Sequence, residues 1–414
     1  MTTTKNNEHK KLNFPNEQEQ SQACLNSAEH EKNQGRKVLN VPNLRFPEFQ
    51  GEWEESKLGD VATSISSGKS KASCGNYNLY GSTGVIGKTC EAFYEGQMLL
   101  IARVGANAGK LQIINEKCGI TDNTLIVKTE RIPATYIYYY LQHFNLNRLF
   151  FGSGQPLITG GMLKKVMIPL GNDAEQNKIT NLLSLIDVHI ATQSKVINRL
   201  QSLIKGLADN LLDNPLWEKT YLRSFMQFFS TNSLSWEQLS YKEGEIRNLH
   251  YGLIHGFLTS GIDSASLPMI KYGAMPKQYT LCKVGDVAFA DASEDTGDIG
   301  KSVEFVDTIE ADTICGLHTI HGRDVKNKTL VGFKGFAFNC RYFHDQIKRL
   351  AQGTKVFSIT ANNLSSCYVY LPDIETQKVI VRLLKAYEEQ LIVCRMTLKQ
   401  YEKQKQYLLR QMFI

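Results

Sequence analysis

The sequence lacks the features that would assign it to several common classes of protein. Its nine cysteines are scattered singly, and because none forms a C-x-x-C pair, neither a zinc knuckle nor a thioredoxin-like redox site is predicted. An odd number of cysteines in a chain of 414 residues favours reduced thiols in the cytoplasm. There is no signal peptide and no apolar run long enough to cross a membrane, so we expect a cytoplasmic protein without membrane contact.

The chain also has little net charge of either sign. Its 47 Lys and Arg residues against 41 Asp and Glu give a formal net charge of +6, which permits a nucleic-acid partner without demanding one. Hydrophobic residues make up 42% of the chain, enough for the cores of two or three domains. Residues 1–40 are rich in Lys, Asn, Glu and Gln, and this stretch is predicted to be a disordered extension.

Two segments resemble nucleotide or cofactor motifs but are incomplete. Gly81 to Thr89 is similar to a phosphate-binding loop, except that Ser82 stands where a glycine is required and no apolar helix follows. Asp213 to Trp217 is similar to the Asn-Pro-Pro-aromatic element of amino-methyltransferases, but the second proline is missing. We therefore interpret this second segment as a helix end followed by a linker.

Metal and nuclease motifs are equally incomplete. Pro372 to Glu375 is similar to the start of a nuclease metal site but lacks the Glu-x-Lys that would follow. The histidines form no H-E-x-x-H pattern, and His250 and His255 are interpreted as surface or satisfied histidines. The sequence thus predicts no catalytic residue, no metal ligand and no cofactor site in this chain.

What the sequence does contain is a duplicated heptad pattern. Apolar residues recur at alternating spacings of four and three from Ile179 to Leu211, interrupted only by Gln193, and again from Ile380 to Met412, with one charged member, Lys405. This spacing predicts two long coiled-coil helices. A coiled coil between two chains is an alternative, but two equal patterns in one chain favour antiparallel pairing within it, because the domain between them lets the chain turn back.

The segments that precede the two helices share an order of short strands and polar loops. Each contains a predicted strand, a loop that ends in Gly-Lys and a second predicted strand. The strands are expected at Met98 to Ala102 and Leu111 to Ile114 in the first segment, and at Val287 to Ala290 and Val303 to Val306 in the second. We interpret Trp53 and Trp236, each followed by Glu, as the matching starts of the two segments.

The predicted fold is therefore α+β, with two strand-rich domains, two long antiparallel helices and an internal pseudo-twofold repeat. The expected parts are a disordered extension at 1–40, a strand-rich domain at 41–172, a helix at 173–213, a second strand-rich domain at 214–372 and a second helix at 373–414.

Polar and basic side chains gather in the loops of both domains. Arg and Lys can bind guanine, Asn can bind adenine, Asp can accept a hydrogen bond from cytosine, and Ser, Thr and Tyr can hold phosphates. Loops of any soluble protein carry such groups, so this pattern does not by itself assign a DNA site. The candidate DNA-binding residues are Lys69, Lys71, Tyr80, Ser82, Thr83, Lys88, Arg103, Asn107 and Lys110 in the first domain, and Ser293, Asp295, Lys301, Arg323 and Lys326 in the second.

The order of several short motifs resembles the specificity subunits of type I restriction-modification systems. The segments that resemble their common opening and the start of their spacer helices are Pro42 to Phe49, Gly51 to Trp53, Lys57 to Asp60, and Glu175 to Ile179. Those that resemble two different classes of their target-recognition domains are Tyr80 to Gly84, Arg103 to Gly105 and Asp122 to Thr124 in the first domain, and Gly285 to Val287, Asp291 to Asp295 and Gly300-Lys301 in the second. The chain departs from the family's pattern at Thr376, where Glu is usual, and in its polar N-terminal extension.

This resemblance implies a DNA-binding function without catalysis. Each strand-rich domain would be a target-recognition domain for one half of a split double-stranded DNA target, and since the two domains differ, the target would be asymmetric. The helices from Ile179 to Leu211 and from Ile380 to Met412 would fix the gap between the half-sites and bind two methyltransferase subunits. Two motor-nuclease subunits would complete the complex, and S-adenosylmethionine, ATP and Mg²⁺ would belong to those partners. A coiled-coil scaffold and a stand-alone DNA-binding regulator remain alternative functions.

Overall fold

The structure is a computed structural model that describes residues 40–150, 155–256, 261–262, 264–306 and 311–414. The chain divides into two units, one formed by Met1–Leu185 with Lys405–Ile414 and the other by Ile186–Gln404. Each long helix therefore contributes to both units. The predicted N-terminal extension lies outside the described residues, apart from its last residue, Asn40.

The first unit is built on an antiparallel four-stranded sheet, in the order β2–β8–β5–β6. These strands are β2 (Ser64–Ser67), β5 (Gln97–Ala102), β6 (Leu111–Asn115) and β8 (Thr124–Lys128). β5 is buried from Met98 to Ala102, because strands flank it on both sides and the helix α3 (Ala134–Phe144) packs against β5 and β6. The predictions of strands at Met98 to Ala102 and at Leu111 to Ile114 are confirmed.

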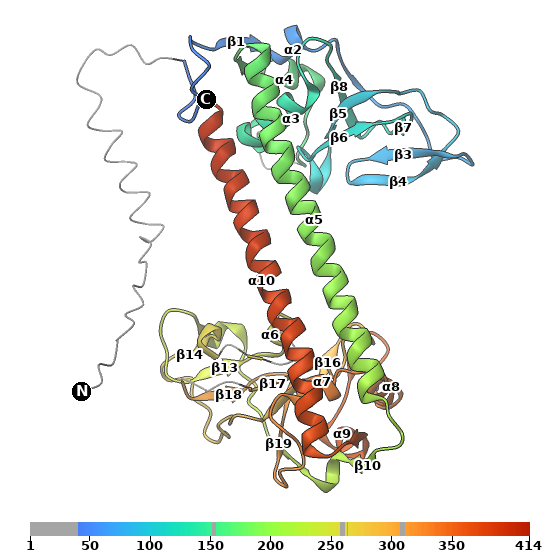
Figure 1. Cartoon of the computed structure of the whole chain (residues 1–414), viewed down its shortest axis with the longest axis vertical. Helices are drawn as coiled ribbons and strands as arrows, with labels where there is room; N and C mark the ends of the chain where they lie inside the picture. The colour runs from blue at the N-terminus through green and yellow to red at the C-terminus, as the bar shows by residue number, and fades with distance from the viewer. Residues whose placement is uncertain (1–39, 151–154, 257–260, 263, 307–310) are drawn as a thin grey trace, which may run out of the picture. The chain divides into compact units, whose positions relative to one another are not determined.

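A smaller sheet packs on this core and carries a β-hairpin, which Figure 1 shows as the pair β3 and β4. Its order is β4–β3–β7, formed by β3 (Tyr77–Gly81), β4 (Gly84–Thr89) and β7 (Gly119–Ile120). The segment that resembles a phosphate-binding loop is the turn of this hairpin and its second strand. β5 and not a helix follows β4, so the segment lacks the helix of a phosphate-binding loop.

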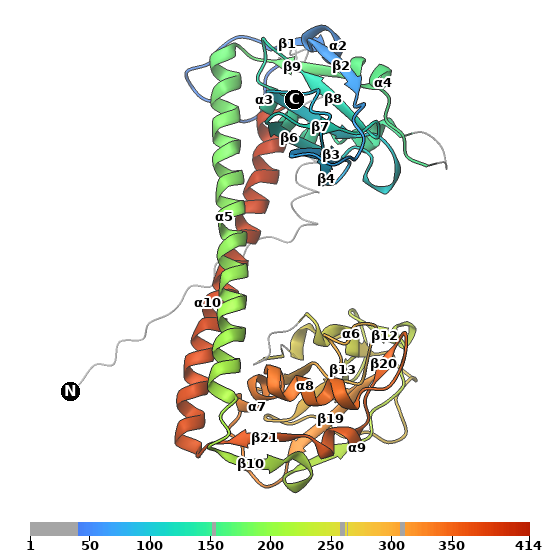
Figure 2. The same ribbon diagram turned by 90° about the vertical axis from the view of Figure 1, so that its right-hand side faces the viewer.

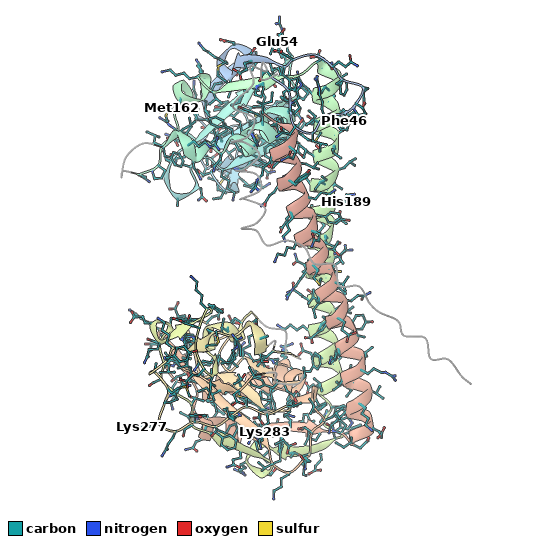
Figure 3. The ribbon with its side chains drawn as sticks, turned by 90° about the vertical axis from the view of Figure 1, so that its left-hand side faces the viewer. Phe46, Glu54, Met162, His189, Lys277 and Lys283 are labelled. Atoms are coloured by element: carbon teal, nitrogen blue, oxygen red, sulfur yellow. The ribbon has the colours of Figure 1, made fainter. Side chains whose placement is uncertain are left out.

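The chain before the first strand of this unit is held by one buried carboxylate at the start of a long helix. β1 (Glu54–Lys57) pairs with β9 (Met167–Leu170), next to the short helices α2 (Leu58–Val61) and α4 (Gly160–Lys164). Glu175 accepts hydrogen bonds from Arg45, at 2.7 and 2.8 Å, and from Nε1 of Trp53 at 3.0 Å. Lys178 lies 4.5 Å from the ring centroid of Phe46, which Figure 3 labels. Because a buried charge requires partners, Glu175 fixes the path of residues 45–53.

The second unit contains two four-stranded sheets, and Figure 2 shows the helices that cover them. One sheet has the order β11–β19–β15–β17, from β11 (Met226–Phe229), β15 (Val287–Ala290), β17 (Ser302–Glu304) and β19 (Thr319–Asp324). The other has the order β12–β14–β13–β18, from β12 (Leu239–Ser240), β13 (Arg247–Leu249), β14 (Met269–Ile270) and β18 (Thr313–Cys315). The remaining elements are β10 (Glu218–Tyr221), α6 (Tyr251–Ile254), β16 (Ala292–Ser293), α7 (Phe333–Ala337), α8 (Arg341–Leu350), β20 (Phe357–Ser358), α9 (Ala361–Ser366) and β21 (Tyr368–Leu371).

The two heptad patterns form two long helices, α5 (Asp173–Leu212) and α10 (Ile374–Met412). Their 40 and 39 residues correspond to lengths of about 60 and 58 Å at 1.5 Å per residue. Within the second unit, heptad residues of both helices share one core, among them Ile197, Ile204, Leu384 and Leu391. In no described stretch is a helix both long enough and apolar enough to cross a membrane.

The helices run antiparallel within the second unit. His189 of α5, labelled in Figure 3, stacks on Tyr401 of α10 with ring centroids 5.3 Å apart. Further along α5, Gln193 donates from Nε2 to the carbonyl of Cys394 at 3.1 Å. This bond satisfies the polar residue that interrupts the first heptad pattern. The predictions of α+β architecture and of pairing within the chain are confirmed.

The internal repeat begins at a different tryptophan from the one predicted. β10 follows Trp217 and pairs with β21 immediately before α10, as β1 follows Trp53 and pairs with β9 immediately before α5. Trp236 lies instead in a 3₁₀ helix (Trp236–Gln238). The match of Trp53 to Trp236 was therefore wrong, and the linker predicted at Asp213 to Trp217 is the link to the first strand of the second copy.

Candidate nucleic-acid interface

The first unit carries a loop from Arg103 to Lys110 at the end of its buried central strand. Two backbone hydrogen bonds of 2.9 Å close it, from the amide of Ala102 to the carbonyl of Lys110 and from the amide of Gly109 to the carbonyl of Ala102. Gly109 has a φ of +86°, a conformation in which an L side chain is strained. The backbone of this loop is thus fixed largely by main-chain bonds.

The second unit carries the equivalent loop from Asp291 to Lys301. The amide of Ala290 donates to the carbonyl of Lys301, and the amide of Gly300 donates to the carbonyl of Ala290, again at 2.9 Å. Gly300 has a φ of +70°, and a Cβ at this position would lie 2.6 Å from Cδ1 of Ile347. The shared Gly-Lys ending of the two loops therefore reflects the same backbone construction in both units.

Arg103 and Asp291 occupy the same place in this construction. Each is the first residue after the buried strand, and the carbonyl of each accepts a hydrogen bond of 2.9 Å from an isoleucine, Ile158 in the first unit and Ile359 in the second. The isoleucine precedes a threonine that caps a short helix, α4 or α9. Two matched positions thus carry side chains of opposite charge.

The side chain of Arg103 has a nitrogen without a partner among the described residues. Its side chain is half-buried, and its Nε atom is buried without a hydrogen-bond partner in the part of the chain that the structure describes. A buried donor without an acceptor costs about 1–3 kcal/mol. The carbonyl of Asn123 accepts from the amide of Arg103 at 2.9 Å and from the hydroxyl of Ser82 at 3.5 Å. Ser82 and Asn123 therefore lie beside Arg103.

Asp291 is held by a neighbouring histidine. Nδ1 of His318 lies 3.1 Å from Oδ1 of Asp291, and the amide of Asp291 donates to the carbonyl of His318 at 3.1 Å. Burial raises the pKa of Asp291, although His318 opposes this effect. The ring of Tyr251 packs edge-on against that of His318 at 5.3 Å between centroids. Asp291 thus holds a positioned carboxylate at the end of β15.

The other candidates of the first unit fall into two groups. Asn107 and Lys110 are exposed on the loop of Arg103, Thr83 is exposed at the hairpin turn, and Lys69 is exposed after β2. Lys71 and Lys88 lie at the opposite end of the hairpin, where the hydroxyl of Thr89 donates to the carbonyl of Lys71, and Nζ of Lys88 donates to Oδ1 of Asn78 at 2.8 Å.

Tyr80 is used within the protein. Its hydroxyl donates to the carboxylate of Glu116. Burial and this carboxylate raise the pKa of Tyr80 to about 12, so the phenol stays protonated near neutral pH. Tyr80 therefore supports the hairpin and is not a free group for phosphate binding.

Ser293 and Asp295 shape the second loop. The hydroxyl of Ser293 accepts from the amide of Asp295 at 3.1 Å, and Oδ1 of Asp295 accepts from the amide of Gly297 at 2.8 Å. Asp295 is nevertheless exposed. Lys301, at the end of the loop, donates from Nζ to the carbonyl of His255 at 3.4 Å.

Arg323 and Lys326 lie at the opposite end of the sheet from this loop. β15 and β19 run antiparallel, with Ala290 opposite Thr319 and Val287 opposite Gly322. Arg323 lies in β19 near its far end and Lys326 follows the strand, so the prediction of a loop was wrong for Arg323.

Arg323 also has a structural partner. Its Nε and a terminal nitrogen each lie 2.7 Å from the buried carboxylate of Asp286. Burial raises the pKa of Asp286, but the hydrogen bonds from Arg323 and His321 outweigh this effect and leave the pKa below its ordinary value. Asp286 is therefore ionised near neutral pH and holds Arg323 in a buried ion pair.

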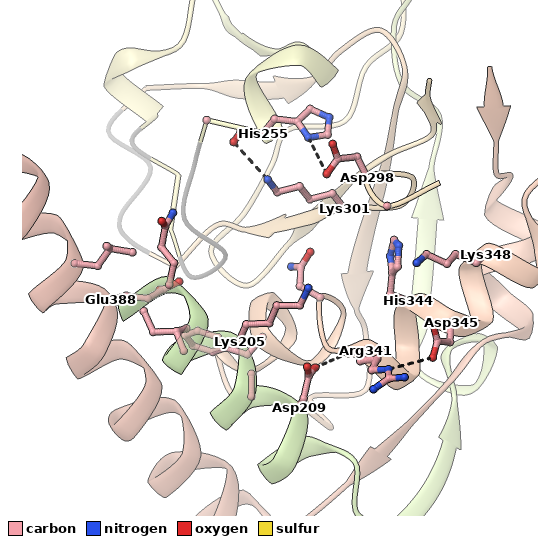
Figure 4. Close-up of a pocket in the computed structure, with 18 of the residues that line it drawn as sticks. Lys205, Asp209, His255, Asp298, Lys301, Arg341, His344, Asp345, Lys348 and Glu388 are labelled. Atoms are coloured by element: carbon pink, nitrogen blue, oxygen red, sulfur yellow. Dashed lines mark hydrogen bonds and ion pairs between the residues drawn. The ribbon is translucent and has the colours of Figure 1, made fainter. Parts of the chain in front are cut away.

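A cavity of about 650 Å³, lined by both basic and acidic side chains, lies beside Lys301 in the second unit (Figure 4). Lys205 of α5, Lys348 of α8 and Arg395 of α10 line it, and within the described ranges none of the three forms an ion pair with a carboxylate. Burial lowers the pKa of His255, another lining residue. With Lys301 and Arg341 the lining has five basic side chains, against four carboxylates from Asp209, Asp298, Asp345 and Glu388. The positive excess is therefore small, and it favours anions such as DNA phosphates only slightly.

Sequence reasoning missed two polar residues next to the first loop. Asn123 was noted only as part of a motif, and its backbone position beside Arg103 depends on the pairing of β5 with β8. A Cβ on Gly105 would lie 3.5 Å from Nε2 of Gln155, which places that amide next to the loop as well. Gln155 follows some fifty residues later in the sequence, and no local pattern connects the two.

Comparisons with known proteins agree with this construction. The family described as "Type I restriction modification DNA specificity domain" matches residues 50–202. The type I restriction enzyme MjaVIII specificity subunit of Methanocaldococcus jannaschii is 25% identical over 403 residues, which cover 87% of this chain and 91% of that protein.

Two solved structures share the fold. The S subunit of a type I restriction-modification system from M. genitalium aligns with a TM-score of 0.59 and 16% identity over 90% of this chain and 99% of that one. A chain from a study of complex assembly and conformational transition of the type I system aligns with a TM-score of 0.52 and 13% identity, over 87% and 97%. Together with the duplicated helices and strand-rich regions, these findings show that the chain belongs to the type I restriction-modification specificity subunits, a family of non-catalytic DNA specificity subunits that carry no cofactor of their own.

Proposed function

We propose that the chain reads an asymmetric, two-part DNA target and directs methylation and cleavage by partner subunits to it. One half-site is assigned to the strand-rich region at 41–172 and the other to the region at 214–372. The observation that carries this proposal is the matched pair of loops, in which the same backbone frame presents Arg103 in one unit and Asp291 in the other.

The chemistry of these two side chains favours different bases. A guanidinium can donate two hydrogen bonds to O6 and N7 of guanine in the major groove, whereas a carboxylate can accept from the amino group of cytosine. A well-placed contact of this kind discriminates against the wrong base by about 1–3 kcal/mol. Two equivalent positions of opposite charge therefore favour half-sites that differ in sequence.

The surrounding residues have supporting roles in this proposal. Ser82, Thr83, Asn107 and Lys110, with Lys69, flank Arg103 and are assigned to the same half-site. Ser293, Asp295 and Lys301, with the cavity beside Lys301, are assigned to the other. The exposed lysines Lys71, Lys88 and Lys326 are proposed only for backbone phosphates, and Tyr80 and Arg323 are assigned to the protein's own structure.

The partner surface is proposed to be the exposed side of the helices from Ile179 to Leu211 and from Ile380 to Met412. Many of their heptad residues pack in the core of the second unit. Other apolar side chains of these helices are exposed, including Leu185, Val188, Leu203, Val379, Ile392, Val393 and Met396. Val393 and Met396 are 60% and 62% exposed. Apolar patches of this kind mark protein interfaces. Two methyltransferase subunits would bind here, and two motor-nuclease subunits would join them.

A test of this proposal is to change Arg103 and Asp291 separately in the complex reconstituted with its methyltransferase subunits. Sequencing of methylated DNA from a random library should show that Arg103→Ala relaxes one position in one half-site, while Asp291→Asn relaxes one position in the other. A loss of about 1–3 kcal/mol corresponds to a roughly 5- to 150-fold weaker binding of the preferred target. Arg131→Ala is the matched control, because Arg131 is an exposed arginine beyond the opposite end of β8.

Three results are distinguishable. Relaxation at one half-site per variant, with Arg131→Ala unchanged, supports the assignment. An unchanged methylation pattern and affinity for Arg103→Ala would remove this residue from the interface. Relaxation of both half-sites by a single variant would contradict the division of the target between the two units.

A further inference from the structure

Two cysteines and a histidine from three different segments meet in the core of the second unit. Cys282 precedes β15, Cys315 ends β18 and His321 lies within β19. One sulfur or ring nitrogen atom of each lies within 4.8 Å of the other two, and all three residues are buried. Among the residues that the structure describes, this is the one place where three such ligand side chains gather.

The distances suit a metal ion better than a disulfide. The sulfur atoms of Cys282 and Cys315 are 3.6 Å apart. A disulfide needs about 2.05 Å between its sulfurs. Two thiolates bound to zinc at about 2.3 Å in a tetrahedron are separated by about 3.8 Å, the edge of that tetrahedron. The observed spacing is therefore close to that of a zinc-bound pair.

The surroundings of the histidine also match a metal site. Oδ2 of the buried Asp286 lies 2.7 Å from Nε2 of His321, and Arg323 in turn binds both oxygens of this carboxylate at 2.7 Å. Ligating imidazoles are commonly fixed in orientation by a carboxylate in this way. The orientation of His321 is thus set by groups that are already held in place.

The charges favour a divalent cation with two thiolates. Zn²⁺ bound to two thiolates and one neutral imidazole has no net charge, which reduces the cost of burial. The neighbouring Asp286 and Arg323 neutralise each other in the same way. A tetrahedral site needs one further donor, which a water molecule can supply.

We propose that Cys282, Cys315 and His321 bind one Zn²⁺ ion with a structural role. β18 belongs to one four-stranded sheet of the second unit, whereas β15 and β19 belong to the other. The ion therefore connects the two sheets at the end of β15 that lies opposite the loop from Asp291 to Lys301. None of its ligands is assigned to DNA, so this inference is independent of the proposed function.

The first experiment measures the metal content of the full chain, purified without chelators or metal-affinity resin. Elemental analysis should find about one zinc ion per chain in the wild type. Cys282→Ser and Cys315→Ser should lower this content to near zero. Cys367→Ser is the matched control, since Cys367 is buried in another core of the same unit, and this variant should keep its zinc.

A second measurement holds even if the serine variants fail to fold. When the wild-type chain is prepared with Co²⁺ in place of zinc, thiolate-to-cobalt charge-transfer absorption and the bands of tetrahedral cobalt should appear. A folded wild-type chain that contains no zinc and binds no cobalt would overturn the proposal. A disulfide between Cys282 and Cys315, found by mass spectrometry of protein alkylated at lysis, would overturn it as well.

Discussion

A buried ion pair in the second unit permits a quantitative test of the packing described above. Lys334 of α7 and Glu304 of β17 have side chains that are 2% and 0% exposed, with Nζ 2.9 Å from Oε1. The other carboxylate oxygen accepts from the amide of Gly335 at 2.7 Å, and Nζ also donates to the hydroxyl of Thr329 at 3.0 Å. Lys334→Met retains most of the side-chain volume but leaves the carboxylate of Glu304 without its cation.

The expected loss of stability is large. Removing one partner from a buried ion pair costs about 3–5 kcal/mol, because the remaining charge stays buried without compensation. A second variant that combines Lys334→Met with Glu304→Gln should regain most of this loss, since an amide oxygen can still accept from the amide of Gly335. Hydrogen exchange of the backbone amides of β15 and β17 in increasing urea would measure the free energy of opening this unit alone.

The loss should also depend on pH. Burial raises the pKa of Glu304 in the folded chain, and Lys334 opposes this effect, so Lys334→Met should raise the pKa further. When the folded pKa of an acid lies above its unfolded value, protonation favours the folded state. The deficit of the variant should therefore be largest above its own folded pKa and shrink as the pH falls towards the folded pKa of Glu304 in the wild type. A deficit below about 1 kcal/mol, or one that does not change with pH, would refute this reasoning.

Three further predictions concern the helices and the second loop. Insertion of seven residues after Leu200 and after Tyr401 preserves the heptad pattern and lengthens each helix by about 10 Å, which is the length of roughly three base pairs of DNA. Methylome sequencing should then show unchanged half-sites with a longer gap, and an unchanged gap would contradict a measuring role of the helices. Gly300→Ala should weaken binding of the second half-site in a fluorescence titration, because its φ is +70° and its Cβ would meet Ile347; unaltered affinity would argue against a rigid loop. Val393→Glu should leave the circular dichroism spectrum unchanged and reduce co-purification of the methyltransferase subunits, whereas full recovery of the complex would exclude this surface.

The parts of the fold that repeat regularly could be predicted from the sequence. An apolar spacing of four and three over five heptads has few other interpretations, and both long helices contain the predicted patterns. The strand at Val287 to Ala290 could be predicted because a short apolar run is bounded by glycine and aspartate, and the structure confirms it. The strand predicted at Val303 to Val306 ends at Glu304. Phe305 remains buried, but its amide bonds to the carbonyl of Asp286 outside the strand ladder.

The start of the second copy could not be predicted because the chain contains two Trp-Glu pairs after the first helix. Only the pairing of β10 with β21, more than a hundred residues apart, distinguishes Trp217 from Trp236. Arg323 was predicted in a loop because its segment is polar, but it lies within β19. His318 and Arg323 are close in sequence, but a strand advances about 3.4 Å per residue, so the two residues lie at opposite ends of β19.

The group of Cys282, Cys315 and His321 left no sign in the sequence that a spacing rule could detect. Known zinc motifs place two ligands within a few residues on one turn. Here each ligand comes from a different segment, and only the packing of two sheets brings the segments together. Single cysteines in a long chain therefore do not exclude a metal site.

The closure of the two loops by main-chain hydrogen bonds has an evolutionary consequence. The main-chain hydrogen bonds of Ala102 and Ala290 to the Gly-Lys pairs that end the loops do not involve the loop side chains. Those side chains can therefore mutate while the loop backbone keeps its conformation. A substitution at Arg103 or Asp291 changes the side chain at the start of the loop, while the buried side chains of the preceding strand stay the same. A chain built in this way can acquire a new preference through single substitutions, and its two copies can diverge independently of each other.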